Sequence, residues 1–474
     1  MDTIWAPKLR DALSDARGAK YRLLANAIET AIEKGVFAVG DKLPPVRDLA
    51  YRLSITPGTV ARAYAILTNS GLLEAGVGRG TFVAAKDAQA PEVTDDTQDF
   101  WEQSLVRQDS SVAVLSSPYL PDVGQVARLR SLLKQVADGP AERLMLYPSR
   151  QGFRPVREAV ANWIGDALLG PLDEKDIVLA HGGQNAILLV MQTVLRGPTP
   201  QIFVEDLSYP GFRRAAETLR AETVALPMDD QGMLPEALDR AARSDCAQLV
   251  CLTPEVQNPT CGFMPPERRE ALARVIKARD LQVLEDDCYR LATPQGPSFR
   301  TLAPDRGWYV ASISKSLTPA LRVGFGVAPQ GRGGELSRAA VYGFFGLAQP
   351  LAELARVFLA STDAQRMATA VQSEFARYIE VAVNHLGRYD IAWRRDVPFL
   401  WLSLPAGWRA ASFCREAESQ GVLIRSADEF VLRDGRAPNA VRIAVNAQIS
   451  LSSFEAAMVK LVNLLDEPPE QISV

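Results

Sequence analysis

The stretch SISKSLTPALRVGFG, residues 312–326, decides how this sequence folds. It overlaps GWYVASIS (307–314), an apolar run that predicts a strand ending in small hydroxyl residues. In α/β folds, ligands bind where such strands end. A lysine placed there, Lys315, can lose its proton and act as a nucleophile, and Ser312 and Arg322 can hold an anionic group beside it. A phosphate-bearing aldehyde suits this set of side chains, whereas a lysine on a loop is ordinarily a solvated surface charge.

The composition limits the class of protein. The chain has 474 residues, 47% hydrophobic and 23% charged, which is enough for about two to four domains with a large core. Its five cysteines form no Cys-x-x-Cys pair, and no apolar run suits a signal peptide or a membrane span, so we expect a cytoplasmic protein with no membrane partner. With only two histidines, a His-rich metal site is not expected.

Charge is distributed unevenly along the chain. Residues 1–83 carry 11 Lys and Arg against 8 Asp and Glu, a net of +3, and the remainder carries a net of −7. A small basic head on a larger acidic body favours different partners for the two parts.

The basic head has the pattern of a helix-turn-helix unit. YRLLANAIETAIEKG (21–35) shows apolar residues at helical spacing before a glycine. VRDLAYRL (46–53) predicts a short amphipathic helix, and TPGTVARAYAIL (56–67) predicts a recognition helix. Thr56 can cap that helix, with Pro57 at its first position.

A predicted hairpin follows these helices. GLLEAGVGRGTFVAA (71–85) has the tip Gly78-Arg79-Gly80, which suits contact with a phosphate or the minor groove. Helix-turn-helix spacing also occurs in helical proteins that never bind DNA. Here, however, helices and wing occur together, which favours a DNA-binding domain.

The head resembles the winged-helix domain of the GntR family. The resemblance rests on Leu43-Pro44, Arg47, Leu49-Ala50, Thr56, Thr59-Val60, Ala63-Tyr64, Leu67, Gly71 and Gly78 to Val83. It implies that double-stranded DNA is contacted by Arg47, Thr56, Thr59, Arg62 and Arg79. Pro57 and Ala61 stand where related domains often carry polar or basic residues, so the operator sequence does not follow.

Residues 84–112 are acidic and polar and have the pattern of a linker. From residue 113 onward, apolar runs alternate with amphipathic helical patterns; the runs are DIVLA, QIFVED, QLVCLTP, LQVLEDD and WYVASIS. This alternation predicts a mostly parallel sheet with helices on both faces and ligands at the carboxyl ends of its strands.

Five features lie at these strand ends, in chain order. HGGQNA (181–186) opens a helix with a glycine pair that can cradle a phosphate, and Tyr209 can stack on an aromatic ring. Asn258, then Asp286 with Tyr289, and finally Lys315 follow. Taken alone, each has an ordinary structural interpretation; Asp286, for example, can pair with an arginine or with a protonated ring nitrogen. Their order favours a single site.

These residues resemble fold-type I pyridoxal-phosphate enzymes of the aspartate aminotransferase superfamily over residues 113–474. The resemblance implies that pyridoxal 5'-phosphate is the cofactor and that Lys315 forms its Schiff base. Asp286 would pair with the ring nitrogen. Asn258 and Tyr289 would hydrogen-bond the ring hydroxyl, and Tyr209 would stack on the ring.

The same resemblance implies a phosphate site and an acid site. The phosphate would be held by Gly183, Gln184, Ser312 and Arg322, and by Tyr147 of the neighbouring subunit. Arg442, in AVRIAVN (440–446), would bind the acid group of an effector through a bidentate pair.

Two positions depart from the family pattern. The NPTG motif is NPTCG here, with Cys261 in the place of the glycine, and VPF (397–399) replaces the glycine pair before the FLW segment. The first change touches the loop beside the ring hydroxyl, and the second touches the small domain that closes over substrate. Cofactor binding tolerates both changes, whereas efficient turnover is more sensitive to them.

A GntR-type winged helix joined to an aminotransferase-like domain resembles the MocR/GabR subfamily of bacterial transcription regulators. This resemblance implies a multidomain chain: a winged helix-turn-helix (1–83, mostly α with a β wing), a linker (84–112) and an α/β PLP-dependent transferase-like domain (113–474) for effector binding and dimerisation.

The implied function is that of a homodimeric regulator. It would sense an amine or amino acid through an external aldimine and control nearby metabolic genes. The alternative is a PLP-dependent aminotransferase with an appended DNA-binding domain, because the cofactor residues are all present and weak transaminase activity is compatible with them. An apo scaffold is disfavoured because Lys315, Asp286 and Arg322 are retained.

Overall fold

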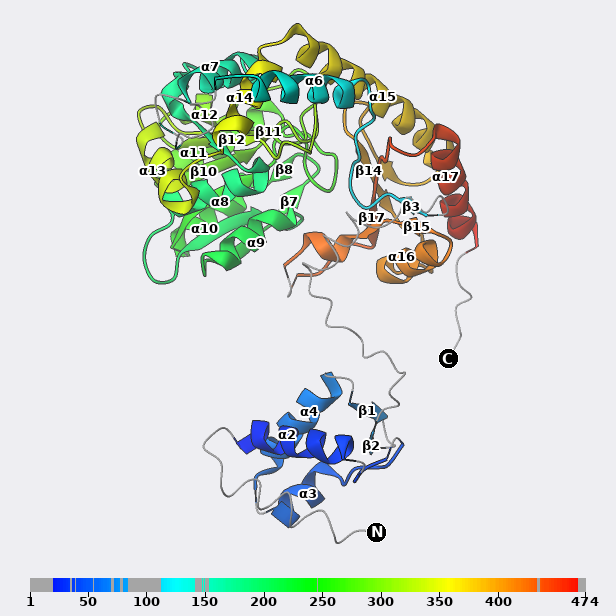
Figure 1. The fold of residues 1–474 in the computed structure, drawn as a ribbon. Helices are drawn as coiled ribbons and strands as arrows, with labels where there is room; N and C mark the ends of the chain where they lie inside the picture. The colour runs from blue at the N-terminus through cyan, green and yellow to red at the C-terminus, as the bar shows by residue number, and fades with distance from the viewer. Residues whose placement is uncertain are drawn as a thin grey trace. The chain divides into compact units, whose positions relative to one another are not determined.

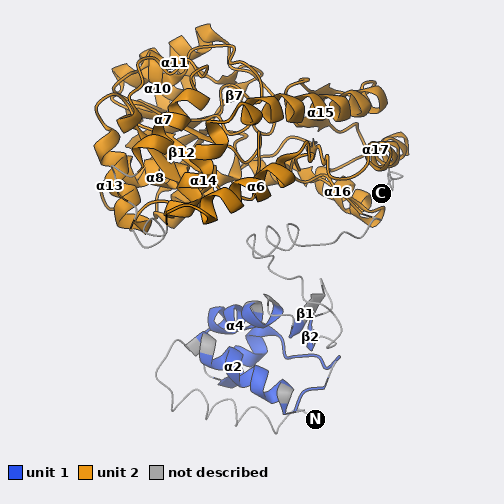
Figure 2. Ribbon diagram, turned by 45° about the horizontal axis from the view of Figure 1, so that its top comes forward, with its two compact units in different colours: residues 1–108 blue, residues 109–474 orange. Residues whose placement is uncertain are grey.

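The computed structural model describes residues 20–34, 36–38, 40–53, 55–69, 72–76, 80–83, 112–140, 147, 149, 153–244, 246–432 and 435–467. The chain divides into two compact units, Met1–Gln108 and Asp109–Val474 (Figure 2). Among the helices described for these units, none combines the length and the apolar character that a membrane crossing requires.

The first unit contains the predicted helix-turn-helix and wing (Figure 1). Its elements are α2 (Lys20–Glu33), α3 (Val46–Leu53), α4 (Pro57–Asn69), β1 (Leu73–Gly76) and β2 (Gly80–Val83). As predicted, Thr56 precedes α4, and its hydroxyl accepts a hydrogen bond from the Thr59 amide at 3.3 Å. The side chains of Leu24, Leu49 and Val60 are buried between the three helices. The predicted winged helix-turn-helix fold is therefore confirmed.

A seven-stranded sheet forms the centre of the second unit, with the order β4-β12-β11-β10-β9-β5-β6. Its strands are β4 (Ile177–Ala180), β5 (Gln201–Glu205), β6 (Glu222–Leu226), β9 (Ala247–Leu252), β10 (Gln282–Asp286), β11 (Gly307–Ser312) and β12 (Gly324–Val327). Only β12 runs antiparallel to its neighbours. A mostly parallel sheet was predicted and is found.

Alternate side chains of these strands pack on opposite faces, which explains why the strands are apolar throughout. Ile177 and Leu179 belong to one core cluster, and Val178 and Ala180 belong to another. One face is covered by α8 (Gly182–Val194), α9 (Pro210–Thr218) and α13 (Gly333–Phe344). The other face is covered by α6 (Gln125–Ala137), α7 (Arg154–Trp163), α10 (Pro235–Ser244), α11 (Pro266–Ala278), α12 (Phe299–Leu302) and α14 (Gln349–Leu359).

A smaller antiparallel sheet, β13-β14-β17-β16, lies beside the long helix α15 (Figure 1). Its region comprises α15 (Thr362–Leu386), β13 (Ile391–Ala392), β14 (Phe399–Ser403), α16 (Ala410–Ser419), β16 (Arg425–Ser426), β17 (Ala440–Ala444) and α17 (Leu451–Asp466). The segment that opens the second unit also belongs here, because β3 (Ala113–Val114) pairs with β15 (Val422–Leu423). The remaining short elements are η2 (Glu174–Asp176), β7 (Met228–Asp229), β8 (Gly232–Met233) and η3 (Ala427–Phe430).

Candidate functional site

One edge of the large sheet carries the predicted cofactor residues that follow its strands. The carboxyl ends of parallel strands meet at the same edge, so the residues that follow β4, β5, β9, β10 and β11 come together there. Strand β12 runs the other way, and its first residue, Gly324, is therefore at this edge as well. That reversal places the preceding Arg322 beside the helix that follows β4.

The start of α8 forms a cradle for an anion. Gly182 has φ +80°, and a Cβ added to it would lie 2.6 Å from Nη2 of Arg322. A Cβ on Gly183 would overlap the sulfur of Cys288 and would lie 3.8 Å from the Cβ of Ser312. Backbone amides at a helix N-terminus and a nearby guanidinium bind phosphate well. Gly182 has a backbone conformation that other residues rarely adopt, and a side chain at Gly183 would collide with Cys288.

Gln184 joins this cradle to the next helix. Its Nε2 donates to the carbonyl oxygen of Gly211 at 2.8 Å, and a Cβ on Gly211 would overlap both Gln184 and the ring of Tyr209. The glycine therefore allows the tyrosine ring to lie close to the backbone.

Asp286 is a buried carboxylate with no cationic partner among the described residues. Its Oδ1 accepts the Cys288 amide at 3.0 Å. The neighbouring Asp287, in contrast, is paired with Arg290 at 2.6 Å and accepts the Tyr309 hydroxyl. Burial raises the pKa of Asp286 to about 6. An unpaired buried carboxylate suits a protonated ring nitrogen.

Two tyrosines enclose the same space. Burial raises the pKa of the Tyr209 hydroxyl above its usual range, and nearby Tyr289, Asp286 and Cys288 raise it further. The ring of Tyr289 lies 5.5 Å from Nζ of Lys315. Tyr209 therefore lies near Tyr289 and Asp286, and Tyr289 lies near Lys315.

The amine of Lys315 has a neutral partner. Its Nζ donates to the carbonyl oxygen of Pro118 at 3.3 Å, and no carboxylate forms an ion pair with it in the described part of the chain. A lysine amine without an ion-pair partner at a strand end can act as a nucleophile.

Arg442 is a buried guanidinium without a carboxylate partner in the described ranges. It is 4% exposed; Nη1 donates to Oδ1 of Asn258 and Nη2 to the Ser116 carbonyl, each at 2.7 Å. Its buried Nε has no acceptor. The rings of Phe399 and Phe430 lie 5.2 and 4.9 Å from the guanidinium carbon. Burial lowers the pKa of this guanidinium, and the positive charge of nearby Arg425 lowers it as well. An anionic ligand would supply the missing charge.

Tyr147 lies outside this cluster of contacts. Its side chain is 85% exposed, and its ring lies 6.4 Å from that of Phe345. The predicted contact is with a neighbouring subunit, so it stays a prediction.

The two departures from the family pattern lie in one apolar cluster. Cys261 has φ +63°, and its sulfur donates to the carbonyl oxygen of Phe399 at 3.3 Å. Val397 and Phe399 belong to the same cluster. A left-handed backbone costs a non-glycine residue about 1–2 kcal/mol, and burial of the thiol in this cluster offsets part of that cost. The loop that carries Asn258 is thus packed directly on β14.

The predicted DNA contacts are placed at α3 and α4. Arg47 is exposed on α3, and Thr56 and Thr59 lie at the start of α4. Arg62 is exposed, with its guanidinium carbon 4.9 Å from the centre of the Tyr21 ring. Arg79 lies outside the described residues.

The sequence did not single out Cys288, Phe430 or Arg425 as parts of this site. Cys288 stands between two predicted residues in DDCY, so its spacing was an available signal. Phe430 and Arg425 lie on η3 and on the two-residue strand β16, which have no sequence periodicity to identify them.

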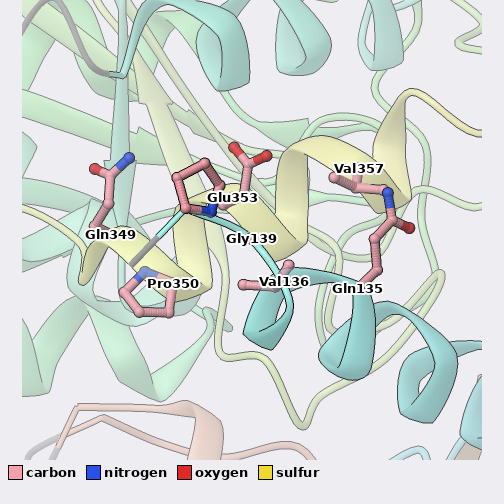
Figure 3. Close-up of a pocket in the computed structure, with 8 residues that line it drawn as sticks. Gln135, Val136, Gly139, Gln349, Pro350, Glu353 and Val357 are labelled. Atoms are coloured by element: carbon pink, nitrogen blue, oxygen red, sulfur yellow. The ribbon is translucent and has the colours of Figure 1, made fainter. Parts of the chain in front are cut away.

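A separate hollow lies between α6 and α14 (Figure 3). Its volume of about 70 Å³ is far below the ~300 Å³ or more typical of small-molecule sites. It is lined by Gln135, Val136, Gly139, Pro140, Gln349, Pro350, Glu353 and Val357, none of which is a predicted site residue.

Comparison with known proteins identifies the families to which the two parts of the chain are similar. The aminotransferase class I and II family matches residues 114–461, and the gntR family of bacterial regulatory proteins matches residues 20–83. The chain is 28% identical over 472 residues to a Bacillus subtilis protein named uncharacterized HTH-type transcriptional regulator YdeF, which covers 98% of this chain and 97% of that one. It is 30% identical to the HTH-type transcriptional regulator TauR of Rhodobacter capsulatus, over 66% of this chain and 68% of that one.

A solved structure shows the same fold in the larger unit. The kynurenine aminotransferase of Pyrococcus horikoshii superposes with a TM-score of 0.69 at 20% identity, over 82% of this chain and 98% of that one. The chain therefore belongs to the aminotransferase class I and II family and, through its N-terminal domain, to the GntR family, in the combination found in MocR/GabR regulators.

Proposed function

We propose that this protein is a PLP-dependent transcription regulator that senses a primary amine or amino acid bearing an acid group and controls nearby metabolic genes. The observation that carries the proposal is the uncompensated Arg442 guanidinium in the same site as Lys315. One group binds an acid and the other forms covalent bonds. In our proposal, residues 1–83 bind DNA, residues 84–112 form a linker, and residues 113–474 bind the effector.

The residues at the strand ends fit pyridoxal 5'-phosphate. The fit rests on the glycine cradle at α8 and on the unpaired, buried Asp286. When bound, the cofactor supplies an aldehyde that reacts reversibly with primary amines. Lys315 Nζ would hold that aldehyde, and Asp286 would accept the ring N–H. The other contacts would come from Asn258 and Tyr289 at the ring hydroxyl, Tyr209 on the ring face, and Gly183, Gln184, Ser312 and Arg322 at the phosphate.

The acid group of the effector would bind Arg442. The Nε edge of the guanidinium has no acceptor, and charge-assisted bidentate pairs are the strongest hydrogen bonds that arginine makes. Asn258 would hold the guanidinium in place through its 2.7 Å hydrogen bond. The site thus favours an amine with an acid group over an amine without one.

We also propose a homodimer, in which Tyr147 reaches the phosphate site of the neighbouring subunit. Large apolar side chains support this proposal: Tyr147, Tyr342 and Phe345 are 85%, 83% and 70% exposed in the single chain. Apolar surface of this kind is typical of an interface.

DNA binding by the GntR domain makes Arg47 the first variant to test. Arg47→Ala should weaken operator binding roughly tenfold and lower the salt dependence, because a phosphate or base contact is lost. Affinity measured at several salt concentrations checks this expectation, with the visible spectrum of the cofactor unchanged. Arg52→Ala is the matched control, since Arg52 lies on the same helix and pairs with Asp48 at 3.2 Å. Equal effects of the two variants would argue against a specific role for Arg47.

The test of the function is operator binding and transcription with and without amines. We expect an amine with an acid group to change operator affinity or promoter output about fivefold or more, the usual range for allosteric coupling.

The alternative, a working aminotransferase with an appended DNA-binding domain, is supported by the presence of every cofactor residue. Steady keto-acid production that is indifferent to DNA, without any change in operator binding, would favour that alternative.

A further inference from the structure

Arg442 has a second arginine beside it. Arg425, on β16, is directly opposite Arg442 on β17 in the small antiparallel sheet. Side chains at directly opposite positions lie on the same face, about 5 Å apart at Cβ, and like charges there repel each other. The pair therefore needs another group to stabilise it.

Both guanidinium groups donate to one neutral oxygen. Nη2 of Arg442 lies 2.7 Å from the Ser116 carbonyl oxygen, and Nε of Arg425 lies 2.9 Å from the same atom. A carbonyl has no net charge and does not neutralise two cations. The Ser116 oxygen thus lies within hydrogen-bond distance of both guanidinium groups. An oxygen of an acid group at the same position would bind both arginines.

The local charges leave a positive surplus. Within the described ranges, Glu429 is the carboxylate that pairs with Arg425, and its side chain is 42% exposed. The side chain of Arg425 is only 16% exposed, and no carboxylate pairs with Arg442 in those ranges. Two guanidinium groups and one carboxylate leave one positive charge, which a monoanionic acid would neutralise.

We infer that Arg425 is a second acid-binding residue, so that the acid group of the effector binds Arg442 and Arg425 together in place of the Ser116 oxygen. The inference rests on the proposed function and narrows the effector to an amine with a monoanionic acid group. Ser116 follows β3 closely in the chain, shortly after the predicted linker. Binding of the acid would therefore release a contact in the segment that leads from the linker.

The variants Arg425→Gln and Glu429→Gln test this assignment, because they should change the affinity for acids in opposite directions. The full-length protein with its cofactor is titrated with 4-aminobutyrate and β-alanine, and with propylamine and ethylamine as matched amines without the acid. Cofactor absorbance follows binding, and operator affinity is the second readout. Arg425→Gln should bind both acids about tenfold more weakly, because a charge-assisted hydrogen bond is lost, and should bind both amines as the wild type does. Glu429→Gln removes a competing carboxylate and should bind the acids about threefold more tightly.

Other outcomes overturn the inference. If Arg425 only holds Ser116, Arg425→Gln frees Arg442, and the acids bind as tightly as before or more tightly. Equal weakening for acids and amines would indicate a structural defect instead. If Arg425→Gln loses the cofactor, Glu429→Gln decides the question, since it should bind the acids more tightly and the amines unchanged, and equal affinities for the acids would overturn the inference. Arg415→Gln, on α16 in the same domain, is the matched control. A wild type that binds acids no better than amines would contradict the proposed function itself.

Discussion

Lys315→Ala is expected to contain no covalently attached cofactor and to lose its response to amines, while still binding its operator. The reason is that Lys315 is the residue that we propose to bind the cofactor covalently; its Nζ lies 5.5 Å from the Tyr289 ring and donates to the Pro118 carbonyl. The winged helix lies in the other compact unit, Met1–Gln108, and has its own buried core. Its affinity for DNA should therefore survive the substitution.

Three measurements check this expectation. The purified wild type should be yellow, and borohydride should fix the cofactor to Lys315, as peptide mapping would show. In Lys315→Ala, both signals should be absent. The change in operator affinity caused by an amine should fall from about fivefold or more to none. Lys277→Ala, an exposed lysine on α11, should behave as the wild type.

Two results would contradict the assignment of Lys315. A borohydride-stable adduct in Lys315→Ala would mean that another lysine carries the cofactor. A normal amine response in a variant without the adduct would mean that exchange of this covalent link is not the switch.

Much of the fold was predictable because strands of a parallel sheet are buried on both faces. DIVLA and QIFVED therefore read as unbroken apolar runs, and the strands Ile177–Ala180 and Gln201–Glu205 form within them. The cap at Thr56 was equally local, since a hydroxyl before a proline is a strong helix start. Asp286 and Tyr289 lie at the end of one parallel strand and Lys315 follows the next, so their placement at one edge of the sheet could be predicted from the sequence.

Contacts between distant segments were not predictable in the same way. Ser116 and Arg442 are joined by a hydrogen bond across 326 positions, and nothing in the sequence around Ser116 indicates it. The reversal of β12 is also invisible in the sequence, because an antiparallel strand buried on both faces has the same apolar pattern as a parallel one. The roles of the predicted site residues, Arg79 and Tyr147 among them, remain predictions.

Arg442→Ala is expected to retain the yellow cofactor but to need about a hundredfold more 4-aminobutyrate for the same spectral change. Its guanidinium is the buried cation of the site, and a bidentate pair with a carboxylate consists of two charge-assisted hydrogen bonds. Propylamine, which has no acid group, should bind the variant and the wild type alike. The concentration of 4-aminobutyrate that Arg442→Lys needs should lie between those of the wild type and Arg442→Ala, because lysine retains the charge and loses the bidentate geometry.

The comparison between acid and amine separates a binding defect from a folding defect. Arg442→Ala leaves the Asn258 oxygen without its 2.7 Å donor and the Ser116 oxygen with Arg425 as its donor, so a loosened loop beside the cofactor is the alternative explanation of weaker binding. That effect would weaken 4-aminobutyrate and propylamine equally and would lower the thermal stability of the protein. Loss confined to 4-aminobutyrate, with an unchanged melting temperature, is what an acid-binding role requires. If 4-aminobutyrate binds Arg442→Ala as tightly as the wild type, the effector acid is bound elsewhere, and the buried charge of Arg442 serves the fold alone.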